Sequence, residues 1–232
     1  MPIPFLSLKW QNTSIKRKEL PKIDFVLITH NHYDHLERKT IQYLNKKNVL
    51  FIVPLGLSDT LEWWGIHKDK IIELGWGEKY QNSDIVFNAE PAIHFSGRWI
   101  FDQNKTLWNS YVIQSINEKN DKIDKQIFCA GDGGYGEHIE YIANKYHNFD
   151  ISLIEIDAWN EKWPYIHMFP KEVIQATKQL NSKYILPVHY GIFPLGMHNY
   201  DTSIKMIIDY AKKEKIIEKL LTPTIGEKIT IK

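Results

Sequence analysis

The sequence has very little cysteine and almost no net charge. Cys129 is the only cysteine among 232 residues, so a disulfide within the chain is excluded. This composition fits a reducing compartment, and we expect a cytoplasmic protein. The formal net charge of +1 argues against a nucleic-acid binder that depends on electrostatic attraction.

Long apolar runs are absent too. The amino terminus lacks the basic region and apolar stretch typical of a signal peptide, and no segment has the length of a transmembrane helix. Hydrophobic residues nevertheless make up 43% of the chain, too many for a disordered protein. No repeat, low-complexity tract or linker divides the sequence, so we predict one domain over residues 1–232.

Apolar runs that suit strands alternate with helical patterns, which predicts an α/β fold. We expect helices over residues 37–45, 58–64, 137–146, 170–180 and 201–215, with Ser58 and Asp201 as N-caps. We expect a hairpin loop over residues 117–125. The expected strands cover residues 25–29, 49–53, 71–74, 84–88, 107–116, 126–130, 151–156, 184–188 and 229–231.

The most informative stretch is His-Asn-His-Tyr-Asp-His at residues 30–35, directly after an apolar strand. Open α/β sheets place their ligands at such carboxyl ends of strands. Imidazole suits zinc, and aspartate adds a hard oxygen ligand. A tight loop cannot aim all four side chains at one ion. The spacing therefore predicts two metal ions, with His30 and His32 facing one, and Asp34 and His35 facing the other.

Three further candidate ligands also follow expected strands: His94, Asp132 and His189. Because strand ends converge on one edge of a sheet, we expect these side chains to join the same site.

The pattern His-x-His-x-Asp-His resembles the signature of the metallo-β-lactamase superfamily. Residues 91–98 (PAIHFSGR), 131–135 (GDGGY) and 189–193 (HYGIF) resemble the branch of N-acylphosphatidylethanolamine-hydrolysing phospholipase D and its bacterial relatives. The resemblance extends over most of the chain from Pro21 to Tyr200. It implies a four-layer αββα sandwich.

The resemblance also implies a site with two Zn²⁺ ions, or other divalent metals in their place. His30, His32 and His94 would bind the first ion, Asp34, His35 and His189 the second, and Asp132 both. Asp34, Asp132 and His167 are the expected catalytic residues, His167 as a proton donor or a substrate-positioning group.

The implied activity is that of a zinc-dependent phosphodiesterase of phospholipase D type. It would hydrolyse a phospholipid or a related phosphodiester through a hydroxide that bridges the metals, with peripheral contact to a membrane. The alternatives are a small-molecule lactonase of the same fold and a non-catalytic, truncated remnant.

Two features depart from the family. Residues 1–20 are polar and broken by prolines, where the family has further strands, so we expect a fold without its first strands. Such a chain would expose a sheet edge and be poorly stable alone, unless a homodimer or a separately encoded amino-terminal piece covers it.

The second departure from the family concerns charged residues. Glu155 and Asp157 stand where the related enzymes have neutral residues, and Lys162 stands where an arginine is expected. The carboxylates would either repel an anionic substrate or bind outer-shell histidines. His138 is expected at the surface, and His198 in capping or packing.

Overall fold

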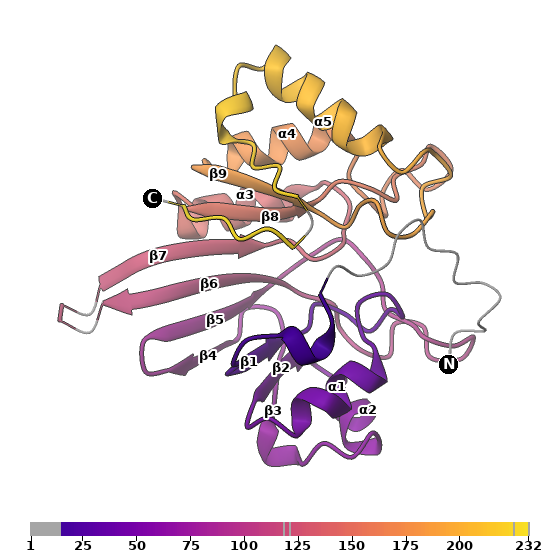
Figure 1. Cartoon of the computed structure of the whole chain (residues 1–232), viewed down its shortest axis with the longest axis vertical. Helices are drawn as coiled ribbons and strands as arrows, with labels where there is room; N and C mark the ends of the chain where they lie inside the picture. The colour runs from indigo at the N-terminus through magenta and orange to yellow at the C-terminus, as the bar shows by residue number, and fades with distance from the viewer. Residues whose placement is uncertain (1–14, 118, 121, 225, 232) are drawn as a thin grey trace. The chain divides into compact units, whose positions relative to one another are not determined.

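The computed structural model of the chain describes residues 15–231 except 118, 121 and 225 (Figure 1). It divides into two compact units. Among the described residues, the amino-terminal unit is Arg17–Gly131, and the carboxyl-terminal unit begins at Asp132. The predictions for residues 1–20 fall mostly outside the described residues, and a single domain over the whole chain stays a prediction.

A parallel sheet begins the amino-terminal unit, with its strands in the order β1 (Phe25–Leu27), β2 (Leu50–Pro54) and β3 (Ile71–Leu74). The helices α1 (Arg38–Asn45) and α2 (Ser58–Trp63) lie against one face of it (Figure 1). Buried apolar side chains from strands and helices form the core between them: Ile28, Leu36, Ile41, Leu44, Val49, Phe51, Val53, Leu57, Leu61, Trp64 and Ile66. Burial on both faces explains the nearly continuous apolar runs of these strands.

An antiparallel ladder completes this unit. It contains β4 (Lys79–Asn82), β5 (Ile85–Glu90), β6 (Ser110–Asn117) and β7 (Lys122–Cys129). A second core joins it to the parallel sheet, through Ile52, Leu74, Phe87, Ala89 and Tyr111. The two sheets of this unit therefore pack face to face, with helices outside one of them.

The predicted hairpin is present, but the predicted extent of its loop, residues 117–125, is wrong. Asn117 belongs to β6 and pairs with Lys122, so the β6–β7 hairpin is much longer than the sequence indicated (Figure 1). The first four residues of β7 are all exposed. They therefore lack the alternation of apolar and polar residues by which a half-buried strand is recognised in a sequence. The strand β4 is polar and mostly exposed, and it was not predicted for the same reason.

The carboxyl-terminal unit contains the parallel pair β8 (Ile151–Glu155) and β9 (Tyr184–Val188). Its helices are α3 (Glu137–Tyr146), α4 (Pro170–Gln179) and α5 (Thr202–Lys213). The helix α4 packs against β8, α3 and α5, so it lies at the centre of this helical layer. With 12 residues α5 is the longest described helix, and no described helix is long and apolar enough to cross a membrane.

Three local predictions fail. Ser58 is the first residue of α2 rather than its cap, and its backbone N–H donates to Glu73 Oε1 at 2.7 Å. Asp201 does occupy the N-cap position of α5, but its carboxylate pairs with Lys205 instead of a helix N–H. Residues 229–231 form no strand, because the chain bridges to Ile185 earlier, at Leu220.

Candidate metal centre

Three histidines meet in the amino-terminal unit. His30 and His32 lie in the loop after β1, and His94 lies in the loop after β5. Their nearest ligand nitrogens all lie within 4.8 Å of one another. The ring centroid of His30 is 4.6 Å from that of His32 and 4.7 Å from that of His94. The structure thus brings together the three residues predicted for the first ion.

The donor set of this histidine triad fits a divalent ion such as zinc. His94 Nε2 and His32 Nδ1 are 3.2 Å apart. Tetrahedral zinc with Zn–N bonds of about 2.0–2.1 Å requires ligand nitrogens about 3.3 Å apart. His30 and His94 are 1% and 9% exposed, so these two rings are shielded from bulk water, while His32 is half-buried. Thr29 Oγ1 lies 3.0 Å from His30 Nδ1 and holds that ring in place.

Asp34 and His35 form a second pair in the same loop. Asp34 Oδ2 lies 3.3 Å from His35 Nε2, and the His35 ring lies 4.1 Å from the His30 ring. Asp34 and His35, two of the residues predicted for the second ion, therefore lie beside the histidine triad within this unit.

Arg98 holds this loop by its backbone, an arrangement we call the Arg98 clamp. Arg98 Nη1 donates to the carbonyl oxygens of Asn31 (2.6 Å), Leu36 (2.9 Å) and His32 (3.3 Å). The Asn31 side chain in turn accepts from the N–H of Gly97 at 2.7 Å. These bonds tie the segment that carries His94 to the loop that carries His30 and His32.

The guanidinium of Arg98 is partly buried and lies 4.2 Å above the Tyr33 ring. Burial lowers the pKa of Arg98, and nearby Tyr33, Asp102 and Asp34 partly offset that effect. Sequence reasoning did not assign Arg98 a role, because its acceptors are backbone carbonyls and these leave no pattern of residue types.

Asp132 and His189 meet in the carboxyl-terminal unit. His189 directly follows β9, and its Nε2 lies 3.2 Å from Asp132 Oδ2. His189 adopts a φ of +60°, which is unfavourable for a residue with a side chain and is concentrated at functional sites. Asp132 is 5% exposed. Its turn is tightly packed, because a Cβ at Gly134 would lie 2.1 Å from the carbonyl oxygen of Tyr165.

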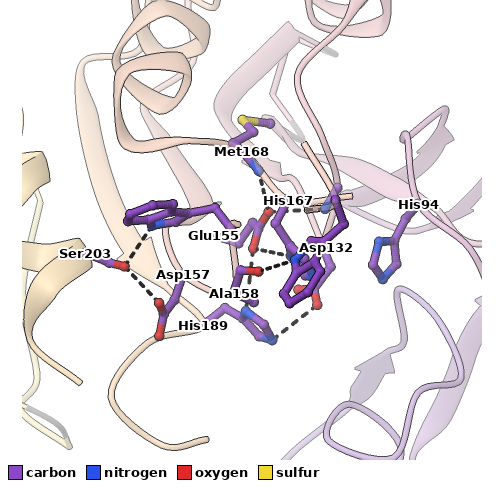
Figure 2. A network of polar contacts seen from close by, with 12 residues as sticks. His94, Asp132, Glu155, Asp157, Ala158, His167, Met168, His189 and Ser203 are labelled. Carbon is purple, nitrogen blue, oxygen red and sulfur yellow. Dashed lines mark hydrogen bonds and ion pairs between the residues drawn. The ribbon is translucent and has the colours of Figure 1, made fainter. Parts of the chain in front are cut away.

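Glu155, the last residue of β8, is fully buried among site residues (Figure 2). Its Oε2 lies 2.8 Å from His167 Nδ1 and 3.5 Å from His189 Nδ1. Its Oε1 accepts from the N–H of Met168 at 3.1 Å. Burial opposes protonation of His167, but the charge and hydrogen bond of Glu155 outweigh it, so the pKa of His167 is raised.

Asp157 makes a parallel arrangement two residues further on. It accepts from Ser203 Oγ at 2.8 Å and lies 3.1 Å from His198 Nε2, while Trp159 stacks on the His198 ring. Of the two roles considered for Glu155 and Asp157, the structure shows the binding of histidines. His198 packs as predicted.

His138 was predicted at the surface, and this is wrong. It lies on α3 with its side chain partly buried, and burial lowers its pKa to about 4. The helical pattern did not indicate this, because the apolar positions of α3 that mark its buried face are Ile139 and Ile142, not His138.

Comparison with known proteins supports the resemblance seen in the motifs. A family model described as the beta-lactamase superfamily domain matches residues 4–190. The uncharacterized protein Rv0906 of Mycobacterium tuberculosis is 33% identical over 214 residues, which cover 90% of this chain and 55% of that protein. The mitochondrial N-acyl-phosphatidylethanolamine-hydrolyzing phospholipase D of Saccharomyces cerevisiae is 33% identical, over 77% of this chain and 38% of the enzyme.

Among solved structures, Igni18, a metallo hydrolase from Ignicoccus hospitalis, matches with a TM-score of 0.70. It is 20% identical, and the match covers 91% of this chain and 80% of that one, so the likeness concerns the fold. The match thus covers about half the length of the mycobacterial relative and less than half of the yeast enzyme. The predicted metallo-β-lactamase-type fold is confirmed. The chain therefore belongs to the metallo-β-lactamase superfamily.

Proposed function

We propose that this protein is a metal-dependent hydrolase, and more specifically a phosphodiesterase of phospholipase D type. The observation that carries the proposal is the donor set. One unit gathers His30, His32 and His94 with Asp34 and His35, and the other gathers Asp132 with His189. Mixed imidazole and carboxylate ligands of this kind suit zinc and other divalent metals.

In this proposal His30, His32 and His94 would hold one ion, Asp34, His35 and His189 would hold a second, and Asp132 would contribute to both. Two bound ions would lower the pKa of a water molecule to about 7 and neutralise charge on phosphate oxygens. Asp132 would orient the attacking water by accepting a hydrogen bond from it.

His167 is the proposed proton donor to the leaving alkoxide. Its Nδ1 is engaged by the buried carboxylate of Glu155 at 2.8 Å, which holds the ring in a defined orientation. A carboxylate on one ring nitrogen stabilises the protonated ring, so that Nε2 carries a transferable proton. This arrangement supports a role for His167 in chemistry as well as in packing.

The phospholipid part of the proposal is supported by the yeast relative and by an apolar loop. Trp99, Ile100 and Phe101 follow Arg98 and are 63%, 75% and 76% exposed. Three consecutive exposed apolar side chains, one of them tryptophan, suit contact with the interfacial region of a lipid layer. We propose peripheral contact with a lipid surface through this loop.

The activity is tested with metal-loaded protein against bis(p-nitrophenyl) phosphate, a simple lactone and nitrocefin. We expect the phosphodiester to be cleaved fastest, and His94→Ala to abolish the cleavage, which excludes a contaminating enzyme. Turnover of the lactone alone would replace the proposal with a lactonase. For the lipid contact, cosedimentation with phosphatidylethanolamine vesicles should weaken when Trp99, Ile100 and Phe101 are all changed to serine.

A further inference from the structure

We infer that His198 is a positioning residue, which holds the loop after β9 in the strained backbone conformation that presents His189. The inference deepens the proposed function, because it rests on the proposed metal centre for the use of His189. Its test measures metal binding and backbone conformation, so it does not depend on the turnover of any substrate.

The loop that joins β9 to α5 covers residues 189–201 and contains two strained positions. His189, its first residue, has a φ of +60°, and Met197 has a φ of +62°. For a residue with a side chain, this left-handed conformation is disfavoured by a factor of about 5–30. Such conformations persist only where the surrounding structure holds them. Contacts with other parts of the chain must therefore hold this loop.

The loop after β8, the strand that pairs with β9, provides these contacts. The His198 ring stacks on Trp159, with centroids 4.5 Å apart and 24° between the ring planes. Nε2 of His198 lies 3.1 Å from Asp157 Oδ1. Asn160 Nδ2 donates to the carbonyl oxygen of Gly196 at 3.0 Å. We call these contacts the His198 latch.

The residues that receive the His198 ring are themselves held in place. Asp157 is 3% exposed and accepts from Ser203 Oγ at 2.8 Å (Figure 2). The indole N–H of Trp159 donates to the same oxygen of Ser203 at 3.0 Å. Ser203 is fully buried in the first turn of α5. The latch therefore fixes the loop to the start of a helix as well as to a neighbouring loop.

The latch is tightly packed around Gly196. A Cβ at this position would lie 2.2 Å from Nε2 of the His198 ring. Met197 lies between the two residues, and its side chain is 70% exposed. The strained backbone of Met197 therefore serves to place the imidazole close to Gly196, because it does not bury the side chain of Met197 itself.

The consequence concerns His189 at the other end of the loop. Its Nε2 lies 3.2 Å from Asp132 Oδ2, as expected of two ligands that share an ion. Without the latch, the loop can return to a negative φ at His189, and the imidazole then moves away from Asp132. Only molecules that keep the positive φ bind the second ion with full affinity, so the apparent affinity falls with their fraction. We expect a loss of about 5–30-fold for that ion.

The test is His198→Ala, with His138→Ala as the matched control. His138 is also a partly buried histidine of the carboxyl-terminal unit, but it lies on α3. In zinc titrations against a chromophoric chelator, His198→Ala should weaken one ion by about 5–30-fold and leave the other unchanged. His138→Ala should leave both affinities unchanged. His198→Phe keeps a ring that can stack on Trp159 and should recover part of the loss.

A second measurement needs no variant. Backbone scalar couplings of His189 in the metal-free protein distinguish a positive φ from a negative one. We expect a positive φ in the unmodified protein and a shift towards negative values in His198→Ala. A negative φ in the unmodified protein would overturn the inference, and so would unchanged zinc affinities in His198→Ala. Equal weakening of both ions, or the same loss in His138→Ala, would also overturn it, because either indicates a general loss of structure.

Failure of the proposed function gives a different result. Zinc affinities and couplings as expected, without phosphodiester turnover, would refute the proposed function and leave this inference standing. Protein that takes up no zinc would refute the metal centre, and the couplings of His189 in the unmodified protein and in His198→Ala would then decide whether the latch holds the loop.

Discussion

Because the Arg98 clamp holds the loop that carries His30 and His32, we predict that substitution of Arg98 alone causes a large loss of stability. Arg98→Met keeps the apolar stem of the side chain but removes the donor shared by the carbonyls of Asn31, His32 and Leu36. Each carbonyl left without its donor costs about 1 kcal/mol or more, so we expect a loss of about 3 kcal/mol. For a chain of this size that corresponds to a decrease in melting temperature of about 6–12 °C.

The assay is thermal unfolding with a chelator present, so that bound metal contributes nothing. Arg98→Lys should recover only part of the loss, because a lysine ammonium cannot reproduce the planar fork of the guanidinium. Arg38→Met is the control. Arg38 is exposed and also lies over tryptophan rings, at 5.1 Å from Trp63 and 6.0 Å from Trp64.

The control variant should unfold within about 0.5 kcal/mol of the unmodified protein. If Arg98→Met also unfolds at the same temperature as the unmodified protein, the carbonyl contacts do not stabilise the loop and the reasoning is refuted. A further check is zinc affinity, which should fall in Arg98→Met and not in Arg38→Met, because Arg98, unlike Arg38, contacts the loop that carries His32 from the segment that carries His94.

Three further predictions concern other residues. Elemental analysis should find close to two divalent ions per chain and markedly fewer in Asp132→Ala; protein that takes up no metal on titration would refute the site. His138 has a folded-state pKa of about 4 against its ordinary 6.5, so the unfolded chain binds a proton first. Stability should therefore fall as the pH decreases from 6.5 to about 4, and His138→Gln should flatten that part of the urea-unfolding profile; an unchanged slope would contradict the burial. Tyr111 donates its hydroxyl to the carbonyl of Ile28 at 3.0 Å, and Tyr111→Phe should cost about 1–2 kcal/mol in urea unfolding, whereas no change would mean that water replaces the bond.

The sequence predicted those features whose signal is local. The helix over 137–146 and the strand over 184–188 match α3 and β9 residue for residue, because apolar spacing and flanking turns define them. The seven candidate ligands could be found from sequence for a similar reason. Each is a chemically distinctive residue in or directly after a strand-to-loop transition.

The parts that could not be predicted depend on contacts between distant residues. The contacts of the Glu155 side chain are made with His167 and His189, which lie 12 and 34 residues further along the chain. The residues next to Glu155 in the sequence indicate neither that it is fully buried nor whether it repels a substrate or binds histidines. The Arg98 clamp could not be predicted from the sequence at all, because its acceptors are peptide carbonyls, which every residue type carries.

The crowding at Gly134 has a consequence for how this protein can vary. The carbonyl oxygen of Tyr165 occupies the space that any side chain at position 134 would need. The side chain of Tyr165, by contrast, is 76% exposed. In a library that samples every amino acid at both positions, functional clones should retain glycine at 134 and accept many residues at 165. Two positions in direct contact would thus show opposite tolerance, because one is constrained by its missing side chain and the other only by the path of its backbone.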